Sequence, residues 1–474
     1  TVPLATWRAG DFSGLAPTLV RDPFAANTPF PGNRIPAARI SSVSQRLQDR
    51  FYPLPNYGDP NVFANQNFRQ LLTRAFDGQT TWSMRFDHRI SEKSFVYSRY
   101  QWNRSYSMGF DGALPTIGQK WQQRDTRAAA VSYSYSFSPT LLNEVRWGLA
   151  FNKNPRHGPL NGKQLVQELG LRGLVDNLPD MPGIFKVSFS GIGLAGISQT
   201  DWNHPGSQNF PMQFQEQLSW FRGRHSLKAG MLWSRVGFAD APASSNLFGS
   251  ATFSNRFTGH PYADFLLGIP TTSARGFPPV RIDNLRWARD FFLTDDFKIT
   301  RQLTLSIGAR YEYRPYWSEQ SGLQSVFDIG SGRIVVPDGS LSRVSPLLPR
   351  GYVDVVEARQ AGYTSGTLIK TDANNVAPRF GLAYRPWGNS TVFRAGYGIF
   401  YDTNPASTGS GGVPFVISEP SFTNPTPVPT VVFPLVFPLA GTGGPTTVSI
   451  PRAIRPDLRY PFSMQYNVTI EHER

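Results

Sequence analysis

The sequence contains no cysteine among its 474 residues. Disulfide bonds, thiolate chemistry and metal sites with cysteine ligands are therefore excluded. Charged residues make up only 17% of the chain, below the roughly one quarter that is usual in soluble domains. The sequence also has no apolar run of about 18 residues or more, so we expect no transmembrane helix.

Two further stretches lack the features of a membrane segment or an export signal. VVFPLVFPLA at 431–440 is short and is broken by Pro434 and Pro438, which favours a loop. The first residues, TVPLATWRAGDFSG, do not show the charged and then apolar order of a signal peptide. If the protein is exported, we expect its signal to lie outside this sequence.

Aromatic residues are abundant at 14%, and 43 glycines and 40 prolines predict many turns and long irregular loops. The formal net charge is +14, which is compatible with nucleic acid or an anionic surface as a partner. However, the arginines and lysines are scattered and form no basic run. We therefore expect no nucleic-acid partner, and expect these side chains to line a lumen or to solvate loops.

The stretch LTLSIGARYEYR at 303–314 alternates between apolar and polar residues. Successive side chains of a strand point to opposite faces, so this pattern predicts a strand between two different environments. A soluble sandwich would place a core on one side and water on the other. A membrane barrel would place lipid on one side and a water-filled lumen on the other.

The same alternation predicts five hairpins and one final strand. The expected ranges are 80–90 with 95–106, 122–137 with 141–152, 209–221 with 225–238, 286–299 with 303–314, 379–387 with 391–401, and 461–471 alone. In the return strand of the first hairpin, Arg99 falls on the same side as Phe95 and Tyr97, so the pattern leaves room for a β-bulge.

The connections between these strands alternate in length. Turns within hairpins have a few residues, whereas the segments between hairpins are long: 107–121, 153–208, 239–285, 315–378 and 402–460. This alternation is typical of outer-membrane barrels, with short periplasmic turns and long extracellular loops. We therefore predict an all-β fold: an antiparallel transmembrane β-barrel with meander topology in the outer membrane of a Gram-negative-type bacterium, surrounded by lipid.

Each strand has an apolar face rich in aromatic residues and a polar face rich in arginine. The candidates for lipid-facing aromatic residues are Tyr133, Tyr135, Trp147, Trp220, Tyr311, Phe393 and Tyr397. The candidates for lumen-facing residues are Arg85, Asp87, Arg89, Arg146, Arg310, Glu312, Arg314 and Arg394. The polar set would contact a plug or a passing substrate, or would simply form a solvated ladder of cross-strand ion pairs.

Several stretches, spread in order along the chain, resemble the barrel of TonB-dependent receptors, particularly the Oar-like group. They are FPGNRIPAARIS (30–41), FYPLPN (51–56), WSMRFDHRISEKSFVYSRY (82–100), SPTLLNEVRWG (138–148), FRGRHSLKAG (221–230), PYADFLLG (261–268), DDFKITRQLTLSIGARYEY (295–313) and APRFGLAYRPWGNSTVFRAGYGIFYD (377–402). The resemblance implies a barrel of about 22 strands, filled by an N-terminal plug and energised by the TonB system.

The sequence departs from that family pattern in three ways. It shows neither a plug nor a TonB box, it supplies about eleven strands, and it ends at 471–474 without a closing aromatic-terminated strand. We therefore expect an internal fragment, about half of a barrel, whose sheet edges at 80–90 and 461–471 stay unpaired. We expect residues 1–78 to be a loop-rich extracellular segment and 79–474 to hold the strands and long loops.

No motif points to catalysis, a cofactor or a metal. GIGLAG at 191–196 matches a dinucleotide-binding pattern, but ISQTDWNHPG follows it instead of a helix, so we expect a flexible loop. Asp295 and Asp296 are adjacent and should point to opposite faces, which prevents joint acid–base work. The histidines at 157, 204, 225 and 260 are isolated, and His88 alternates onto an apolar face.

Three functions remain open from the sequence. The first is a receptor or transporter barrel that passes an unknown bulky ligand. The second is a passive porin-like or adhesin-type outer-membrane barrel. The third is a soluble all-β protein that binds carbohydrate or acts as an enzyme. The absence of a convergent catalytic group and the unequal loops argue against the third, and we expect no enzymatic activity.

Overall fold

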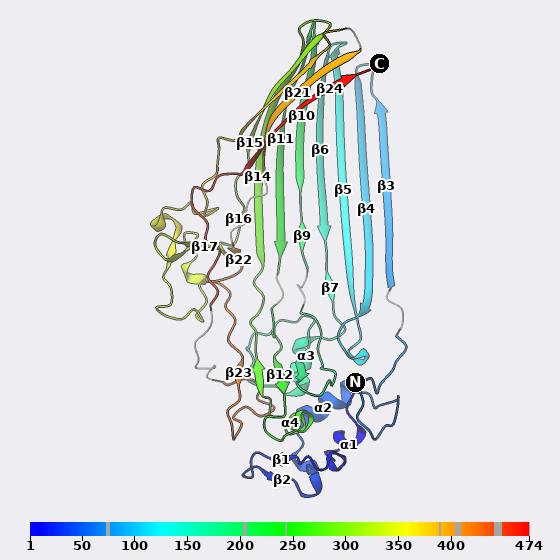
Figure 1. Ribbon diagram of the computed structural model, residues 1–474, viewed down its shortest axis with the longest axis vertical. Helices are drawn as coiled ribbons and strands as arrows, with labels where there is room; N and C mark the ends of the chain where they lie inside the picture. The colour runs from blue at the N-terminus through cyan, green and yellow to red at the C-terminus, as the bar shows by residue number, and fades with distance from the viewer. Residues whose placement is uncertain are drawn as a thin grey trace.

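In the computed structural model, one long antiparallel sheet dominates the molecule (Figure 1). The structure describes residues 1–72, 76–201, 206–241, 244–387, 390–402, 409–439 and 448–473. The strands of the main path are β3 (Phe76–Arg89), β4 (Ser94–Phe110), β5 (Gln119–Ser138), β6 (Leu141–Lys153), β10 (Met212–Arg222), β11 (His225–Asp240), β14 (Ile282–Lys298), β15 (Leu303–Tyr313), β20 (Val376–Tyr384), β21 (Thr391–Tyr401) and β24 (Phe462–His472).

Each of these strands pairs with its neighbours in chain order, which confirms the predicted meander and all five hairpins. The strands reach further toward the long loops than predicted: β4 continues to Phe110 and β5 begins at Gln119. The pairing of these strands continues there because backbone hydrogen bonds form between strands with polar side chains as well as between strands with apolar ones. The turn predicted at 388–390 falls partly outside the described residues.

Short strands extend the sheet at the same end. They are β7 (Arg156–His157), β9 (Gln208–Asn209) and β16 (Ser318–Glu319). The β-bulge considered for the first hairpin is absent, because the register between β3 and β4 is unbroken from Phe76 to Arg89. A register shift occurs instead in the second hairpin, between Ser136 and Ser138 of β5.

The long loops at one end fold into a globular unit, which we call the cap (Figure 1). Its helices are α1 (Ala5–Arg8), α2 (Ser42–Phe51), α3 (Gly162–Leu169) and α4 (Pro261–Leu267). Its small sheets are β1 (Arg21–Asp22) with β2 (Thr28–Pro29), and the order β23 (Phe422–Thr423), β13 (Thr272–Ala274), β12 (Ser250–Phe253), β8 (Lys186–Phe189).

One hydrophobic core holds the cap together and draws on segments far apart in the sequence. Helix α2 contributes Val43, Leu47 and Phe51, which repeat every four residues and are all buried. Helix α4 begins with a proline in its first turn and is followed by Gly268, whose φ of 70° suits glycine. Residues 191–196 contribute buried Leu194 rather than a nucleotide-binding turn, and residues 197–201, which come directly after them, form no helix.

The apolar stretch at 431–440 is a turn-rich loop, as predicted, over its described part, residues 431–439. Phe433 and Val436 are buried in the core of the cap. Nearby, the partly buried Arg275 guanidinium donates to both carboxylate oxygens of Glu419 at 2.5 and 3.1 Å and to the Gly173 carbonyl at 2.9 Å. The cap therefore has both an apolar core and buried polar contacts between distant loops.

A second loop unit packs beside the middle of the main sheet. It contains the order β19 (Val355–Glu357), β18 (Arg333–Val336), β17 (Gln324–Asp328), β22 (Gly409–Ser410) and its own small cores. Single 3₁₀ turns complete the loops: η1 (Ser13–Leu15), η2 (Pro31–Asn33), η3 (Ala37–Arg39), η4 (Pro115–Ile117), η5 (Leu341–Arg343) and η6 (Ala358–Ala361).

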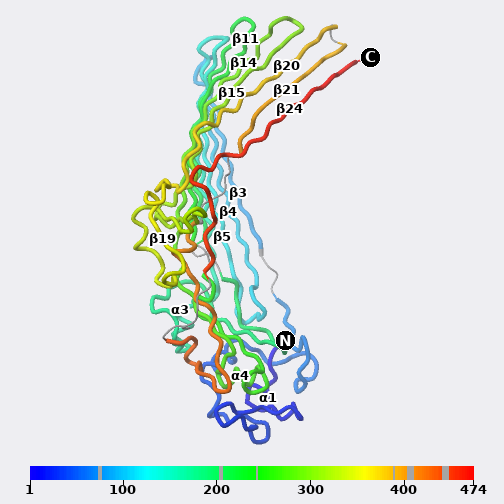
Figure 2. The backbone as a smooth tube through the Cα atoms, turned by 60° about the vertical axis from the view of Figure 1, so that its left-hand side comes forward, coloured from blue at the N-terminus to red at the C-terminus, as the bar shows by residue number. Residues whose placement is uncertain are grey.

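The main sheet is open, with β3 and β24 as its two edges. Among the described residues these two strands do not pair with each other, as the sequence predicted. Figure 2 shows that the sheet is curved and that β20, β21 and β24 splay away from the other strands toward the C-terminus. No helix in the described part of the chain is long and apolar enough to cross a membrane.

Candidate functional site

The sheet has one continuous polar face, because residues directly opposite each other on neighbouring strands share a face. One row of partners crosses eight strands from β3 to β15. Its members are Asp87, Tyr97, Ser132, Arg146, Gln215, Leu232, Asp290 and Glu312. Seven of these eight residues can hydrogen-bond through their side chains, so this face is suited to water or to a polar solute.

The opposite face is apolar along the adjacent row of partners. The members of this row are Tyr133, Val145, Glu216, Met231, Phe291 and Tyr311. Apart from Glu216, all are aromatic or aliphatic. Both Tyr133 and Phe291 are more than a third exposed in this open sheet.

The register brings the predicted site residues together in two groups. All eight charged candidates lie on the polar face, including Arg394, which is reached through the partners Thr304 and Ala383. All seven aromatic candidates lie on the other face, including Phe393 and Tyr397. The assignment of the first face to a lumen and of the second to lipid stays a prediction.

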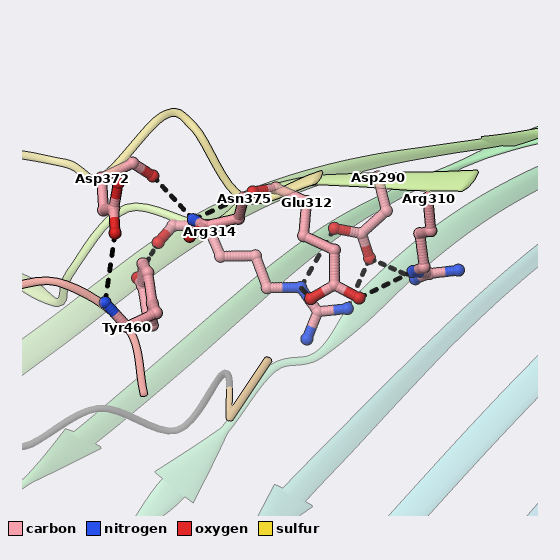
Figure 3. A network of polar contacts seen from close by, with 7 residues as sticks. All are labelled: Asp290, Arg310, Glu312, Arg314, Asp372, Asn375 and Tyr460. Atoms are coloured by element: carbon pink, nitrogen blue, oxygen red, sulfur yellow. Dashed lines mark hydrogen bonds and ion pairs between the residues drawn. The ribbon is translucent and has the colours of Figure 1, made fainter. Parts of the chain in front are cut away.

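A buried ion-pair network occupies the polar face of β14 and β15 (Figure 3). Asp290 is only 1% exposed and accepts from Arg310 at 2.6 Å and from Arg314 at 3.0 Å. Arg310 also donates to Glu312 at 2.8 Å. Glu312 also lies 3.8 Å from Arg314, so two guanidinium groups compensate two carboxylates and the charges of this network are mutually dependent.

Loop residues fix this network from outside the sheet (Figure 3). The Glu312 amide donates to the Asn375 carbonyl at 3.0 Å, and the Asn375 side chain donates to the Asp372 carbonyl at 2.9 Å. The Tyr460 amide donates to Asp372 at 3.2 Å, and the Tyr460 hydroxyl donates to the Arg314 carbonyl. The network thus ties two long loops to one place on the polar face.

Sequence reasoning missed four members of this network: Asp290, Asp372, Asn375 and Tyr460. Asp290 could have been predicted from the sequence, because alternation along β14 places Asp290 on the same face as Asp296. The other three lie in loops, where no periodic pattern exists.

A second polar cluster lies near the short turns of β3 to β6. Arg85 pairs with Asp87 at 2.5 Å and its guanidinium lies 4.6 Å from the ring centre of Tyr97. Arg146 pairs with Glu144 at 2.8 Å, and Ser132 also donates to Glu144, at 2.9 Å. A cavity of about 450 Å³ opens between these side chains.

Two further cavities lie on the same face toward the cap. One of about 340 Å³ is lined by Lys120 and Arg156, and one of about 290 Å³ by Arg124. Both are also lined by Ser107 and Gln122, so they adjoin each other. The polar face therefore offers hollows at several levels between the cap and the short turns.

The chemistry of these clusters is that of hydrogen bonding and charge, not of metal binding. Across the described ranges, no group of three or more histidine, aspartate or glutamate side chains comes together as metal ligands. Asp295 and Asp296 point to opposite faces, as predicted: Asp295 pairs with His225 at 2.6 Å, and Asp296 accepts from Ser306 at 2.6 Å. His157 stacks on a tryptophan, and His204 lies outside the described residues.

The cap contains a buried titratable pair. The ring of His260 lies 4.6 Å from that of Trp7, and burial lowers the pKa of His260 to about 4. Asp264 is fully buried and accepts from the Thr258 amide at 2.7 Å and its hydroxyl at 2.6 Å. Burial raises the pKa of Asp264 to about 7, although hydrogen bonds from Thr258 and Phe257 oppose this rise.

Solved structures that resemble the chain include the FpvA receptor of Pseudomonas aeruginosa bound to pyoverdines, at 11% identity, covering 69% of this chain and 35% of that one, with a TM-score of 0.36. The ferric-catecholate import receptor Fiu of Escherichia coli K12 is 12% identical, with coverages of 72% and 47% and a TM-score of 0.35.

The ferric preacinetobactin receptor BauA of Acinetobacter baumannii is 9% identical, with coverages of 71% and 43% and a TM-score of 0.32. The chain thus spans less than half of the length of each of these three receptors. No curated protein matches the sequence at a significant level.

The family match covers far more of the chain. The family model described as "Outer membrane beta barrel domain" matches residues 1–474. It agrees with the meander of long antiparallel strands, the short turns at one end and the two contrasting faces. The protein is therefore a member of the outer-membrane β-barrel domain family and resides in the outer membrane of a Gram-negative-type bacterium.

Proposed function

We propose that this chain forms part of the wall of a receptor or transporter barrel that passes a bulky polar ligand across the outer membrane. The observation that carries the proposal is the mainly polar face, which the strand register connects from β3 to β24. In a barrel this face would line the lumen, and the hollows along it would offer successive weak sites to a moving solute.

The cap supports a receptor rather than a passive pore. It has a core of its own, and it lies at the end of the sheet opposite the short turns (Figure 1). Short turns are periplasmic in such barrels, so the cap would face outward, where a ligand first arrives. An ordered cap over the lumen would restrict free diffusion and would offer a surface for selective binding.

The finer features of the proposal come from resemblance to Oar-like TonB-dependent receptors. We propose that the eleven strands form about half of a barrel of about 22 strands, with residues 79–474 as its wall. Residues 1–78 would lie on the extracellular side as part of the cap. A plug inside the lumen and the TonB system in the periplasm would be its partners, and the protein would have no enzymatic activity.

Conductance measurements distinguish the receptor from a porin-like pore. The complete gene product is placed in a planar lipid bilayer bathed in potassium chloride. A receptor closed by its cap and plug is expected to show no steady conductance, and a variant without cap residues 154–201 is expected to conduct more. Large steady conductance of the unaltered protein would contradict the proposal and favour a passive pore.

A further inference from the structure

Two arginines lie on the apolar face where strands β11 and β14 pair. Arg289 is directly opposite Trp233, and Arg235 is directly opposite Trp287. All four side chains share the face that carries Phe291, because they alternate with the polar positions of the same two strands. We call them the arginine–tryptophan cluster.

Cation–π contacts hold the cluster together. The Arg235 guanidinium lies 5.8 Å from the ring centre of Trp287, and the Arg289 guanidinium lies 5.7 Å from the ring centre of Trp233. The two tryptophan ring centres are 5.9 Å apart. Nη1 of Arg235 lies 3.5 Å from the place that a Cβ atom of Gly237 would take, so this side chain runs along β11 toward the cap.

No carboxylate compensates these two charges. The nearest acidic residues on the same face are Glu216, one row toward the short turns, and Asp283, two rows from Arg235 toward the cap. Within the described ranges, neither guanidinium of the cluster has a carboxylate at ion-pair distance or donates a hydrogen bond. By contrast, Arg127 on the same face pairs with Asp125 at 3.3 Å.

The cluster lies at the far boundary of the apolar band. Arg235 is ten residues from His225, where β11 leaves its short turn, and Arg289 is nine residues from Lys298 at the short-turn end of β14. A tilted transmembrane strand crosses the hydrocarbon core in roughly 9–11 residues. Because short turns are periplasmic in such barrels, the cluster would lie at the level of the outward-facing headgroups, where barrels carry an aromatic girdle.

We propose that the arginine–tryptophan cluster binds the anionic phosphate headgroup of a membrane lipid in the outward-facing leaflet. Guanidinium groups bind phosphate oxygens through paired N–H donors. Diagonal neighbours on paired strands are about 7–8 Å apart, so one phosphate is within reach of both arginines. Trp233 and Trp287 are 47% and 37% exposed and offer ring surface to the acyl chains. A lipid is the occupant because its headgroup supplies the negative charge that the chain lacks here.

This inference goes beyond the proposed function and does not depend on transport, but it does rest on the assignment of this face to lipid. The absence of cysteine allows a separate check of that assignment. Met231→Cys, one row from the cluster, is treated with a water-soluble maleimide in outer membranes. If Met231→Cys is shielded and the cluster shows no lipid preference, this inference alone is overturned. Rapid labelling would overturn the assignment and the inference together.

Native mass spectrometry of the complete protein in detergent measures lipid binding. Phosphatidylglycerol, which is anionic, and phosphatidylcholine, which has no net charge, are added at equal concentrations. We expect at least fivefold more bound phosphatidylglycerol, and we expect Arg235→Gln/Arg289→Gln to lower this ratio at least threefold. The matched control is Arg104→Gln/Arg127→Gln, which removes two charges beside Asp125 on the same face and should leave the ratio unchanged.

Two results of this experiment would overturn the inference. One is an unchanged ratio in the Arg235→Gln/Arg289→Gln protein. The other is an equal fall in the control pair, because binding would then follow net charge and not the cluster. Heat-modifiable migration on a gel checks that each variant is folded. If the double variant does not fold, the exposed Arg289→Gln alone should lower the ratio at least twofold, and an unchanged ratio there would contradict the proposal.

Discussion

Asp290 shows how much a single residue on the polar face depends on its partners. Its carboxylate is shielded from water and is compensated by Arg310 and Arg314. The sequence predicted both arginines as members of the polar face, because alternation assigns every strand residue to one of two faces. It could not predict that Asp372 and Tyr460 close the same network, because these side chains arrive from loops whose paths depend on packing far away.

Asp290→Ala should be strongly destabilising. It leaves Arg310 and Arg314 with one of their two carboxylate partners, Glu312, in a place with little water, and breaking such a buried pair costs about 3–5 kcal/mol. Urea unfolding of the complete protein in lipid vesicles measures the change. Asp290→Asn is the matched control, because it keeps the shape and should cost less. A loss below ~1 kcal/mol for Asp290→Ala would show that water already screens the network.

The buried pair in the cap predicts two opposite pH dependences. The folded pKa of Asp264 is about 7 against an ordinary 3.8, so the folded state holds the proton more tightly and Asp264 reduces stability as pH rises through this window. The folded pKa of His260 is about 4 against 6.5, so His260 reduces stability as pH falls from 6.5 to about 4.

Single variants separate the contributions of Asp264 and His260 to the pH dependence of stability. Asp264→Asn should leave a cap that loses about 3 kcal/mol of stability as pH falls from 6.5 to 4, since each pKa unit corresponds to about 1.4 kcal/mol. His260→Phe should leave a cap that loses stability as pH rises from 4 to 7. Hydrogen–deuterium exchange of residues 257–268, corrected for the intrinsic effect of pH, measures both. Equal pH profiles for the two variants would contradict this account.

At the scale of the element, strand β15 was predictable because its pleat imposes a strict period of two. Leu305 and Ile307 fall on the apolar face, and Ser306 and Arg310 on the polar face, as the pairing with β14 requires. Aromatic residues are a weaker guide to the apolar face. Phe95 and Tyr97 lie on the polar face with Arg99, and the register between β3 and β4 places them there without a β-bulge. Helix α2 was missed because its apolar repeat spans only ten residues.

Leu305→Arg and Thr304→Arg form a matched pair of changes on neighbouring positions of β15. If the apolar face meets lipid, Leu305→Arg should cost about 2–4 kcal/mol near the middle of the bilayer and less near its boundary. Thr304→Arg, which faces the lumen in this account, should cost less than ~1 kcal/mol. Unfolding in lipid vesicles gives both values, and similar costs for the two variants would be evidence against two different environments.

At the scale of the whole molecule, the open sheet is the feature that most limits the stability of this chain on its own in a membrane. Every backbone donor and acceptor in lipid must be paired within protein, and barrels achieve this by closure. Both edge strands, β3 and β24, lack a second partner along the main path. Strand order followed from the sequence because neighbours in the chain pair, whereas the folding of distant loops into one cap did not, because it depends on contacts across hundreds of residues.

The 474-residue chain produced on its own should therefore aggregate through its edges and fail to insert into vesicles. A complete barrel should shift on a gel when heated, because folded barrels resist detergent until they are unfolded by heat. The isolated chain should show no such shift. Heat-modifiable migration of the isolated chain would instead indicate a small barrel closed by pairing between β3 and β24.

The central claim is that one face of the sheet meets water and the other meets lipid, and labelling of single cysteines in a cysteine-free chain tests it most directly. Cysteine replaces each residue of 303–308 in turn, and outer membranes are treated with a water-soluble maleimide. We predict that positions 304, 306 and 308 react and that 303, 305 and 307 react at least tenfold less. Equal labelling along the strand, or the opposite alternation, would contradict the account.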